Sequence, residues 1–340
     1  MNTQSNQRGL LKLRFFFIIS LVIVLIFVVA YFFYSLVPLT EGAPSVKFQI
    51  IKGESLKEIA THLMEKSLIK SAFIFEFYAL LSGRAQKFQP GIYDLSAAMS
   101  IPQIVNTLVN GGKDEVILTI VEGATLKDID EFLSDHQVIE KNSLINFPLD
   151  RLSNTYPFLV NVEIKSLEGF LMPDTYHFKM YSSAADVLEK ILNNFYNKAW
   201  PLLANKTDWY RLLILASYLE REVPKFEDRQ IVAGIILKRF SHQMPLQIDA
   251  TVSYAKCNGR LKTCPSPLVD KKDLEISSVY NTYKNLGWTP TPIANPSVNA
   301  IRAALTPKAS PYWYYLSSKT GETIFSKNLD GHNLNKAKYL

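Results

Sequence analysis

The longest hydrophobic stretch lies near the N-terminus, where 23 consecutive residues from Phe15 to Val37 include only Ser20 and Ser35 as non-apolar members. A run of this length can cross a bilayer as a helix, and no small-residue cleavage pattern of a signal peptide follows it. Residues 1–14 contain three basic residues and no acidic one, which by the positive-inside rule predicts a cytoplasmic tail. We therefore expect residues 15–37 to form a retained single-pass helix in the inner (cytoplasmic) membrane, with the remaining chain exported to the periplasmic or extracytoplasmic side.

A strand pattern followed by a helical pattern occurs twice in the exported part. Gly53 and Ser55 recur as Gly123 and Thr125, 70 positions later, each pair before an amphipathic run. In both copies a β-type run enters a glycine turn, and the hydroxyl residue stands where a helix N-cap is expected. We expect the first copy to continue with a second helix over 71–82 and a returning strand over 88–95.

Helical periodicity dominates the C-terminal half, with helices expected over 182–196, up to Glu220, and over 227–240. The fold class is therefore α+β. We expect five parts: the tail (1–14), the transmembrane helix (15–37), a first module (45–112), a second strand–helix unit with a connecting region (113–180), and a mixed α+β domain (181–340).

Charge and composition exclude several classes of function. The 37 Lys and Arg residues only modestly exceed the 31 Asp and Glu residues, and no basic arm indicates nucleic-acid binding. The five histidines are scattered and no phosphate loop is present, so neither a metal nor a cofactor is expected. Export makes Cys257 and Cys264 a candidate disulfide, with two free thiols as the alternative.

Glu220 is the polar residue most suggestive of chemistry. It ends the apolar helical run from Leu212 to Leu219, just before Pro224. Ionising an acid in the last helical turn costs about 0.3–1 kcal/mol, because the negative end of the macrodipole lies there. An acid that holds its proton and faces a cleft is what cleavage of a glycosidic bond requires. The alternative is an ordinary solvated helix end.

Side chains suited to sugar binding surround this helix in the sequence. They are amides, hydroxyls, carboxylates and aromatic rings on turns and proline-fixed loops, although each is also compatible with a core or turn position. The candidates for substrate binding are Ser217, Glu222, Gln247, Asp249, Thr251, Tyr254, Tyr280, Asn281, Tyr283, Glu168 and Asp174.

Four segments resemble the YceG-like family. Its Ala-Ser-x-x-Glu-[Lys/Arg]-Glu pattern is met at 216–222, its Leu-Gln-x-Asp-x-Thr-Val-x-Tyr pattern at 246–254, its Tyr-Asn-Thr-Tyr at 280–283, and its Glu-Gly-x-x-x-Pro-Asp-Thr-Tyr turn at 168–176. Ala250 replaces a usual proline, and Thr289 and Thr291 depart from the family's Gly-Leu-Pro-Pro-Gly-Pro-Ile loop. Residues 45–112 resemble a LysM module, a type of domain that binds N-acetylated glycans.

The resemblance implies that residues 181–340 form the catalytic domain and that Glu220 is its catalytic acid. It implies an endolytic peptidoglycan lytic transglycosylase, which cleaves the MurNAc–GlcNAc bond within nascent strands, leaves 1,6-anhydroMurNAc ends and terminates elongation. Peptidoglycan strands are the implied substrate and peptidoglycan synthases (penicillin-binding proteins) the implied partners.

Two alternatives remain open. One is a membrane-anchored peptidoglycan-binding scaffold without turnover, and the other is a hydrolytic muramidase in which Asp249 holds a water. An acid at position 220 that has no basic neighbour and faces a groove would favour an enzyme.

Overall fold

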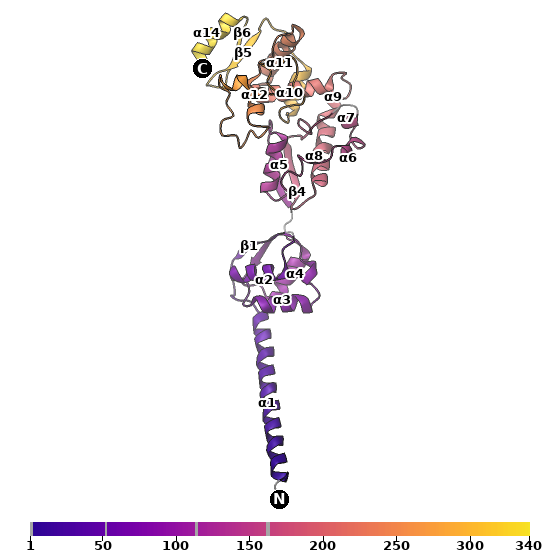
Figure 1. Ribbon diagram of the computed structural model, residues 1–340, viewed down its shortest axis with the longest axis vertical. Helices are drawn as coiled ribbons and strands as arrows, with labels where there is room; N and C mark the ends of the chain where they lie inside the picture. Colours follow the sequence, from indigo (N-terminus) through magenta and orange to yellow (C-terminus); the bar gives the residue numbers. More distant parts are fainter. Residues whose placement is uncertain (1–2, 52, 113–114, 161–163) are drawn as a thin grey trace. The chain divides into compact units, whose positions relative to one another are not determined.

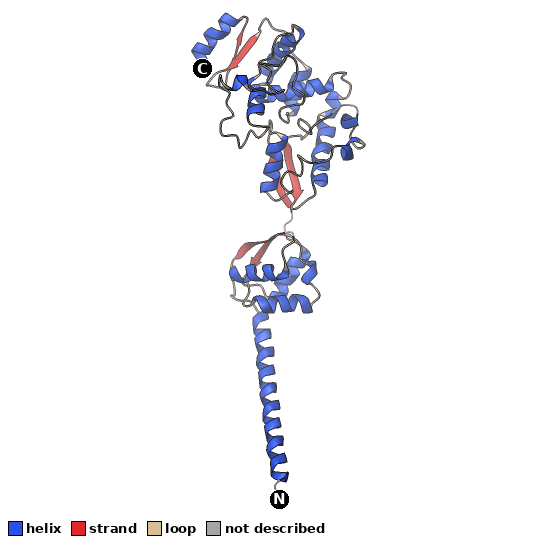
Figure 2. Ribbon diagram, in the orientation of Figure 1, coloured by secondary structure: helices blue, strands red, loops and turns tan. Residues whose placement is uncertain are grey.

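The computed structural model describes residues 3–51, 53–112, 115–160 and 164–340. The chain forms two compact units, residues 1–115 and 116–340, and both mix helices with short strands (Figure 2). The strands of the described residues form three two-stranded sheets, in which β1 pairs with β2, β3 with β4, and β5 with β6. The mixed α+β class expected from the sequence is confirmed.

The first unit begins with the long helix α1 (Thr3–Leu36). Within the described residues, its segment Phe16–Leu36 alone is long and apolar enough to cross a membrane, with a mean hydropathy of 3.1. The module that follows contains β1 (Ser45–Ile50), α2 (Leu56–Glu65), α3 (Ala72–Leu81), the 3-10 turn η1 (Ala85–Lys87), β2 (Gly91–Ser96) and α4 (Ile101–Asn110). β1 and β2 are antiparallel, from Ser45 opposite Ser96 to Ile50 opposite Gly91.

The second unit is mainly helical (Figure 1). Its elements are β3 (Glu115–Ile120), α5 (Leu126–Asp135), α6 (Asp150–Ser153), α7 (Pro157–Val160), β4 (Asp174–Lys179), α8 (Ala184–Lys198), α9 (Trp200–Leu203), α10 (Trp209–Glu222), α11 (Phe226–Ser241), α12 (Asp249–Lys256), η2 (Asp273–Glu275), α13 (Val298–Leu305), β5 (Tyr314–Ser317), β6 (Thr323–Ser326) and α14 (Leu329–Tyr339).

The predicted strand–turn–helix repeat is confirmed in both copies. Ser55 caps α2 and Thr125 caps α5, each within a capping box completed by the acid three residues later. Gly53 and Gly123 have φ angles of 90° and 75°, a region that residues with a side chain rarely adopt. The glycines therefore recur because both turns need the same backbone conformation.

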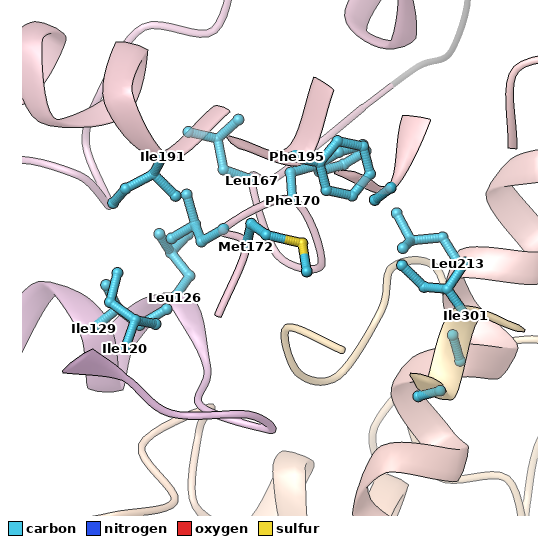
Figure 3. Close-up of a cluster of buried hydrophobic side chains, with 14 of the residues drawn as sticks. Ile120, Leu126, Ile129, Leu167, Phe170, Met172, Ile191, Phe195, Leu213 and Ile301 are labelled. Atoms are coloured by element: carbon cyan, nitrogen blue, oxygen red, sulfur yellow. The ribbon is translucent and has the colours of Figure 1, made fainter. Parts of the chain in front are cut away.

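The core of the second unit forms around α10, whose residues from Leu213 to Leu219 are all buried. Figure 3 shows Phe170 beside Phe195 of α8, and Leu213 of α10 beside Ile301 of α13. Because α10 is buried on most of its surface, the direction of its last turn is fixed by packing on several sides. This fixes the position of Glu220.

Asn295 connects the turn at 169–171 to the segment that leads into α5. Its side-chain oxygen accepts hydrogen bonds from the N–H groups of Gly169 (2.9 Å) and Leu171 (2.8 Å), and its amide donates to the carbonyl of Ala124 (2.9 Å). The Gly123 N–H in turn donates to the Asn295 carbonyl at 3.0 Å. A fully buried amide with these contacts holds residues 123–124 in place.

Cys257 and Cys264 are joined in a disulfide, with their Cα atoms 5.5 Å apart. The loop that they enclose lies on α5: Lys127 Nζ donates to the Asn258 carbonyl at 2.7 Å, and the Lys262 N–H donates to Asp128 at 3.1 Å. The disulfide loop therefore forms part of the surface next to the second repeat.

Candidate active site

Glu220 lies in the last turn of α10 with its side chain only 5% exposed. Arg229 Nη2 of α11 donates to Glu220 Oε1 at 2.7 Å. The backbone N–H and the hydroxyl of Ser297, the N-cap of α13, both donate to Glu220 Oε2, at 2.8 and 2.5 Å. Three helices thus meet at this one carboxylate.

Glu220 has a basic neighbour, so the condition that would have favoured an enzyme, an acid without one, is not met; the alternative of a solvated helix end is wrong, because the Glu220 side chain is buried. Arg229 is 8% exposed, and its Nε donates to the Val223 carbonyl at 2.7 Å. The α10–α11 connection is so short that Arg229 of the second helix reaches back to the end of the first. The buried pair depends on this turn geometry, which local sequence patterns do not reveal.

The hydrogen bonds to Glu220 leave one lone-pair site of its carboxylate available for a proton. A carboxylate has about four lone-pair sites, two on each oxygen. Oε2 accepts two hydrogen bonds from Ser297, whereas Oε1 accepts one from Arg229. A proton can therefore occupy the second site of Oε1 while Arg229 and Ser297 keep the side chain in place.

A cavity of about 380 Å³ lies at the end of α10, where Arg221 and Gly123 line its wall and Glu220 lies behind Gly123. A Cβ placed on Gly123, which lines the cavity, would lie 3.6 Å from Glu220 Cγ and 3.4 Å from Arg221 Cδ. The wall consists of the segment between β3 and α5, one face of α5, the end of α10 and the disulfide loop: Thr119, Ile120, Val121, Glu122, Gly123, Ala124, Asp128, Ile129, Phe132, Arg221, Leu261, Lys262 and Pro267. It offers apolar surface together with charges of both signs, as sugar and peptide groups require.

Glu122 is a second carboxylate near Glu220. Partial burial raises the pKa of Glu122, the charge of Glu220 raises this pKa further, and Arg229 opposes the shift. Two carboxylates that interact in this way ionise together less readily than either does alone.

Sequence reasoning missed Arg229, Ser297 and Glu122. Only Glu122 has a sequence signal: in the first copy of the repeat the residue before the glycine is Lys52, whereas in the second it is Glu122. The two copies of the repeat therefore carry opposite charges at this position.

Glu168 does not face the cavity, and its assignment to substrate binding is wrong. It is buried, and it accepts hydrogen bonds from the Leu126 N–H (2.9 Å), the Tyr254 hydroxyl (3.0 Å) and the Asn295 amide (3.2 Å). Burial raises the pKa of Glu168 to about 8, although the hydrogen bonds from Leu126 and Tyr254 lower it. The residue connects the 168–176 turn to the start of α5. Tyr254, whose hydroxyl is used in this contact, has the same internal role.

Three further candidates are also internal, which corrects their assignment to substrate binding. Ser217 is buried, donates to the Ile214 carbonyl at 2.6 Å and accepts from the Ile293 N–H at 3.1 Å. Thr251 donates to the Ile248 carbonyl at 2.7 Å, and Asn281 is fully buried with its amide on two carbonyls. Their polar groups stabilise loops around α10.

Asp174 begins β4, where Lys198 and Asn194 of α8 bind its carboxylate. The hydrogen bond from Lys198 is the main reason why the pKa of Asp174 is lowered. These partners make Asp174 a link between β4 and α8.

Three of the remaining candidates, Glu222, Asp249 and Tyr283, lie where α10 ends and α12 begins. The Ala250 N–H donates to Glu222 Oε1 at 3.1 Å, and the Tyr283 hydroxyl donates to Asp249 Oδ1 at 2.6 Å. Burial and the charge of Asp249 raise the pKa of Glu222 to about 7. Gln247 and Asp249 are exposed, so this cluster is accessible to a ligand.

The two threonines that depart from the family pattern are accommodated inside the loop. Thr289 donates to the Thr291 carbonyl at 2.6 Å, and Thr291 donates to the Pro292 carbonyl at 2.8 Å. The hydroxyls of Tyr218 and Tyr280 lie 2.8 and 2.9 Å from those of Thr289 and Thr291. The side chains thus supply hydrogen bonds that fix the loop, with Tyr280 half-buried at its edge.

Comparisons with known proteins agree on one family. The model of the YceG-like family matches residues 48–338. A Bacillus subtilis (strain 168) protein named endolytic murein transglycosylase is 36% identical over 318 residues, which cover 88% of this chain and 86% of the relative. A Streptococcus pneumoniae (D39) protein of the same name is 29% identical over 336 residues, 90% of this chain but 60% of the relative. The crystal structure of a YceG-like protein from Listeria monocytogenes superposes with a TM-score of 0.56 at 32% identity, over 86% of this chain and 99% of that one.

Proposed function

The chain belongs to the YceG-like family, and from this premise we propose that it is an endolytic murein transglycosylase, a lyase that cleaves peptidoglycan strands internally. The printed names of its relatives support the reaction class. The assignment to a site rests on the buried side chain of Glu220, which Arg229 and Ser297 hold behind Gly123, a residue that lines the cavity of about 380 Å³.

In the proposed reaction Glu220 transfers one proton twice. Protonated at Oε1, it gives this proton to the oxygen between MurNAc and GlcNAc as the bond to C1 of MurNAc breaks. The resulting carboxylate then takes the proton of the MurNAc 6-hydroxyl while that oxygen bonds to C1, which closes the 1,6-anhydro ring and restores the acid. Because the substrate supplies the nucleophile, no second carboxylate is needed to form a covalent intermediate.

Arg229, Ser297 and Glu122 have supporting roles in this proposal. Arg229 and Ser297 orient the carboxylate during both proton transfers, since their hydrogen bonds leave one site of Oε1 open. Glu122, whose pKa is raised by partial burial and by the charge of Glu220, is proposed as the second carboxylate at this site. Glu222, Gln247, Asp249, Tyr280 and Tyr283 are proposed to bind the glycan.

The other parts of the chain are proposed to bring the site to its substrate. Residues 15–37 anchor the protein in the cytoplasmic membrane with residues 1–14 inside and the remainder outside. Residues 45–112 act as a LysM-like glycan-binding module, 113–180 connect it to the catalytic domain at 181–340, and peptidoglycan synthases that extend nascent strands are the expected partners.

Digestion of long uncrosslinked glycan strands tests the proposal. Wild type should shorten the strands through internal cuts, and Glu220→Gln should be slower by about 10²–10⁴-fold because it lacks the transferable proton. Glu227→Gln, at an exposed acid in the first turn of α11, is the matched control and should keep the wild-type rate. Strands left intact by wild type would favour the scaffold instead, and equal rates for both variants would exclude Glu220.

A further inference from the structure

Helix α3 is apolar on both faces, although only one of them is covered. Ile74, Phe75 and Ala79 are buried in the module core. The opposite face carries four large apolar side chains that are 47–71% exposed: Phe73, Phe77, Leu80 and Leu81. Their spacing of i, i+4, i+7 and i+8 forms one continuous stripe along the helix. A contiguous exposed patch of this kind indicates a surface that is covered in use.

The end of α1 packs against this same module. The rings of Phe32 in α1 and Phe77 in α3 have centroids 5.8 Å apart. Ser35 is buried, and Lys70 Nζ donates to the Tyr34 carbonyl at 2.9 Å. The module thus begins to cover α1 at Phe32, four residues before the helix ends at Leu36.

The length of the part of α1 that the module leaves uncovered determines how close the module lies to the bilayer. In the sequence Arg14 precedes the apolar run, and residues 15–31 precede the first residue that the module covers. At 1.5 Å per residue these 17 residues span only about 26 Å, less than the hydrocarbon core of about 30 Å. The hydrocarbon core of the bilayer must therefore extend along α1 as far as Phe32, the residue that contacts Phe77 of α3.

We infer that the Phe73, Phe77, Leu80 and Leu81 face of α3 inserts into the outer interface of the phospholipid bilayer beside α1. This inference rests on the proposed transmembrane role of α1. Tyr31 and Tyr34 are exposed at the same level, where aromatic residues favour the headgroup region. Arg84, just before η1, and Lys87, at its end, follow the stripe and suit contact with lipid phosphates. The bilayer already surrounds α1 at this level, so it covers the stripe without a further protein. The module is thereby held at the membrane surface.

Fluorescence quenching in vesicles tests the insertion with the full chain. Single cysteines replace Leu80 on the stripe, Val24 in the span, and Val46, an exposed apolar residue of β1. Figure 1 shows β1 at the end of the module away from α1. Each protein is labelled with an environment-sensitive dye without reduction, because the native cysteines are joined in a disulfide. Vesicles of phosphatidylethanolamine and phosphatidylglycerol hold about one protein each, with or without lipids that carry a nitroxide just below the headgroup or deep in the chain.

The predicted result is quenching of about twofold or more at position 80 by the shallow nitroxide, quenching at position 24 by the deep nitroxide, and almost none at position 46. Quenching at 24 with none at 80 would overturn the inference while leaving the anchor intact. No quenching at 24 would instead contradict the proposed span. A dye at position 80 with the emission of a dry environment but shielded from both nitroxides would show that protein covers the stripe, which also overturns the inference.

Discussion

Replacing Glu220 by Gln is expected to destabilise the second unit even though the change is nearly isosteric. Gln cannot carry the negative charge that faces Arg229 at 2.7 Å, and both side chains are less than 10% exposed. Arg229 would keep its positive charge in a buried site without its hydrogen-bonded counter-ion. Removing a negative charge from the C-terminal end of α10 stabilises the helix by about 0.3–1 kcal/mol, because the negative end of the helix dipole lies there. This gain is smaller than the loss of the ion pair.

The magnitude follows from the burial of the pair. Removing one partner of a buried ion pair costs about 3–5 kcal/mol. Gln keeps one acceptor oxygen, so a hydrogen bond from Arg229 or from Ser297 can survive. We therefore expect a loss of stability at the lower end of this range, about 3 kcal/mol. For a unit of 225 residues (116–340) this corresponds to a fall in Tm of about 6–12 °C.

Denaturation followed by tryptophan fluorescence measures this effect, because all four tryptophans lie after residue 116. Arg229→Gln and the double variant complete a cycle that isolates the coupling between the two side chains. The loss of stability in the double variant should be smaller than the sum of the two single losses by about 2–3 kcal/mol. The double variant should nevertheless remain inactive. A stable Glu220→Gln protein, or single losses that simply add, would refute the buried pair as the organiser of this site.

Four further predictions follow from individual contacts. Reduction of the Cys257–Cys264 disulfide should lower stability by about 2–3 kcal/mol, measured by denaturation with and without reductant; no change would show that the bridge does not constrain the chain. The folded pKa of Glu168, about 8, lies above the ordinary 4.5, so stability should fall as pH rises through this window, and Glu168→Gln should remove that slope in denaturation curves at several pH values. Asn295→Ala should cost about 3 kcal/mol or more, since it leaves buried partners unsatisfied, and a loss below about 1 kcal/mol would contradict its linking role. Burial and the charge of Glu220 raise the pKa of Glu122, so stability should fall as pH rises above the ordinary carboxyl pKa of 4.5, and Glu122→Gln should remove this slope in denaturation curves; an unchanged slope would contradict the interaction.

Local patterns in the sequence were sufficient for the two strand–glycine–helix units and for the helices α8, α10 and α11, but not for β4, β5, β6 or α12–α14. The strand–glycine–helix repeat was predictable because Gly53 and Gly123 need positive φ angles and Ser55 and Thr125 cap helices, all of which are local requirements.

The environment of Glu220 could not be predicted in the same way. Arg229 and Ser297 lie 9 and 77 positions away, and they meet the carboxylate only because α11 and α13 pack on α10. Glu168 was misassigned for the same reason: an acid in a Gly- and Pro-containing turn looks exposed, whereas long-range contacts with Leu126 and Asn295 enclose it.

The most direct test of the central claim is mass spectrometry of glycan ends made in water enriched in ¹⁸O. If Glu220 directs attack by the MurNAc 6-hydroxyl, wild type should yield 1,6-anhydro ends that contain no solvent oxygen, and Glu220→Gln should yield almost none. Reducing ends that carry ¹⁸O would show that water is the nucleophile, contradict the lytic reaction and make Asp249 the next residue to test as the group that holds this water.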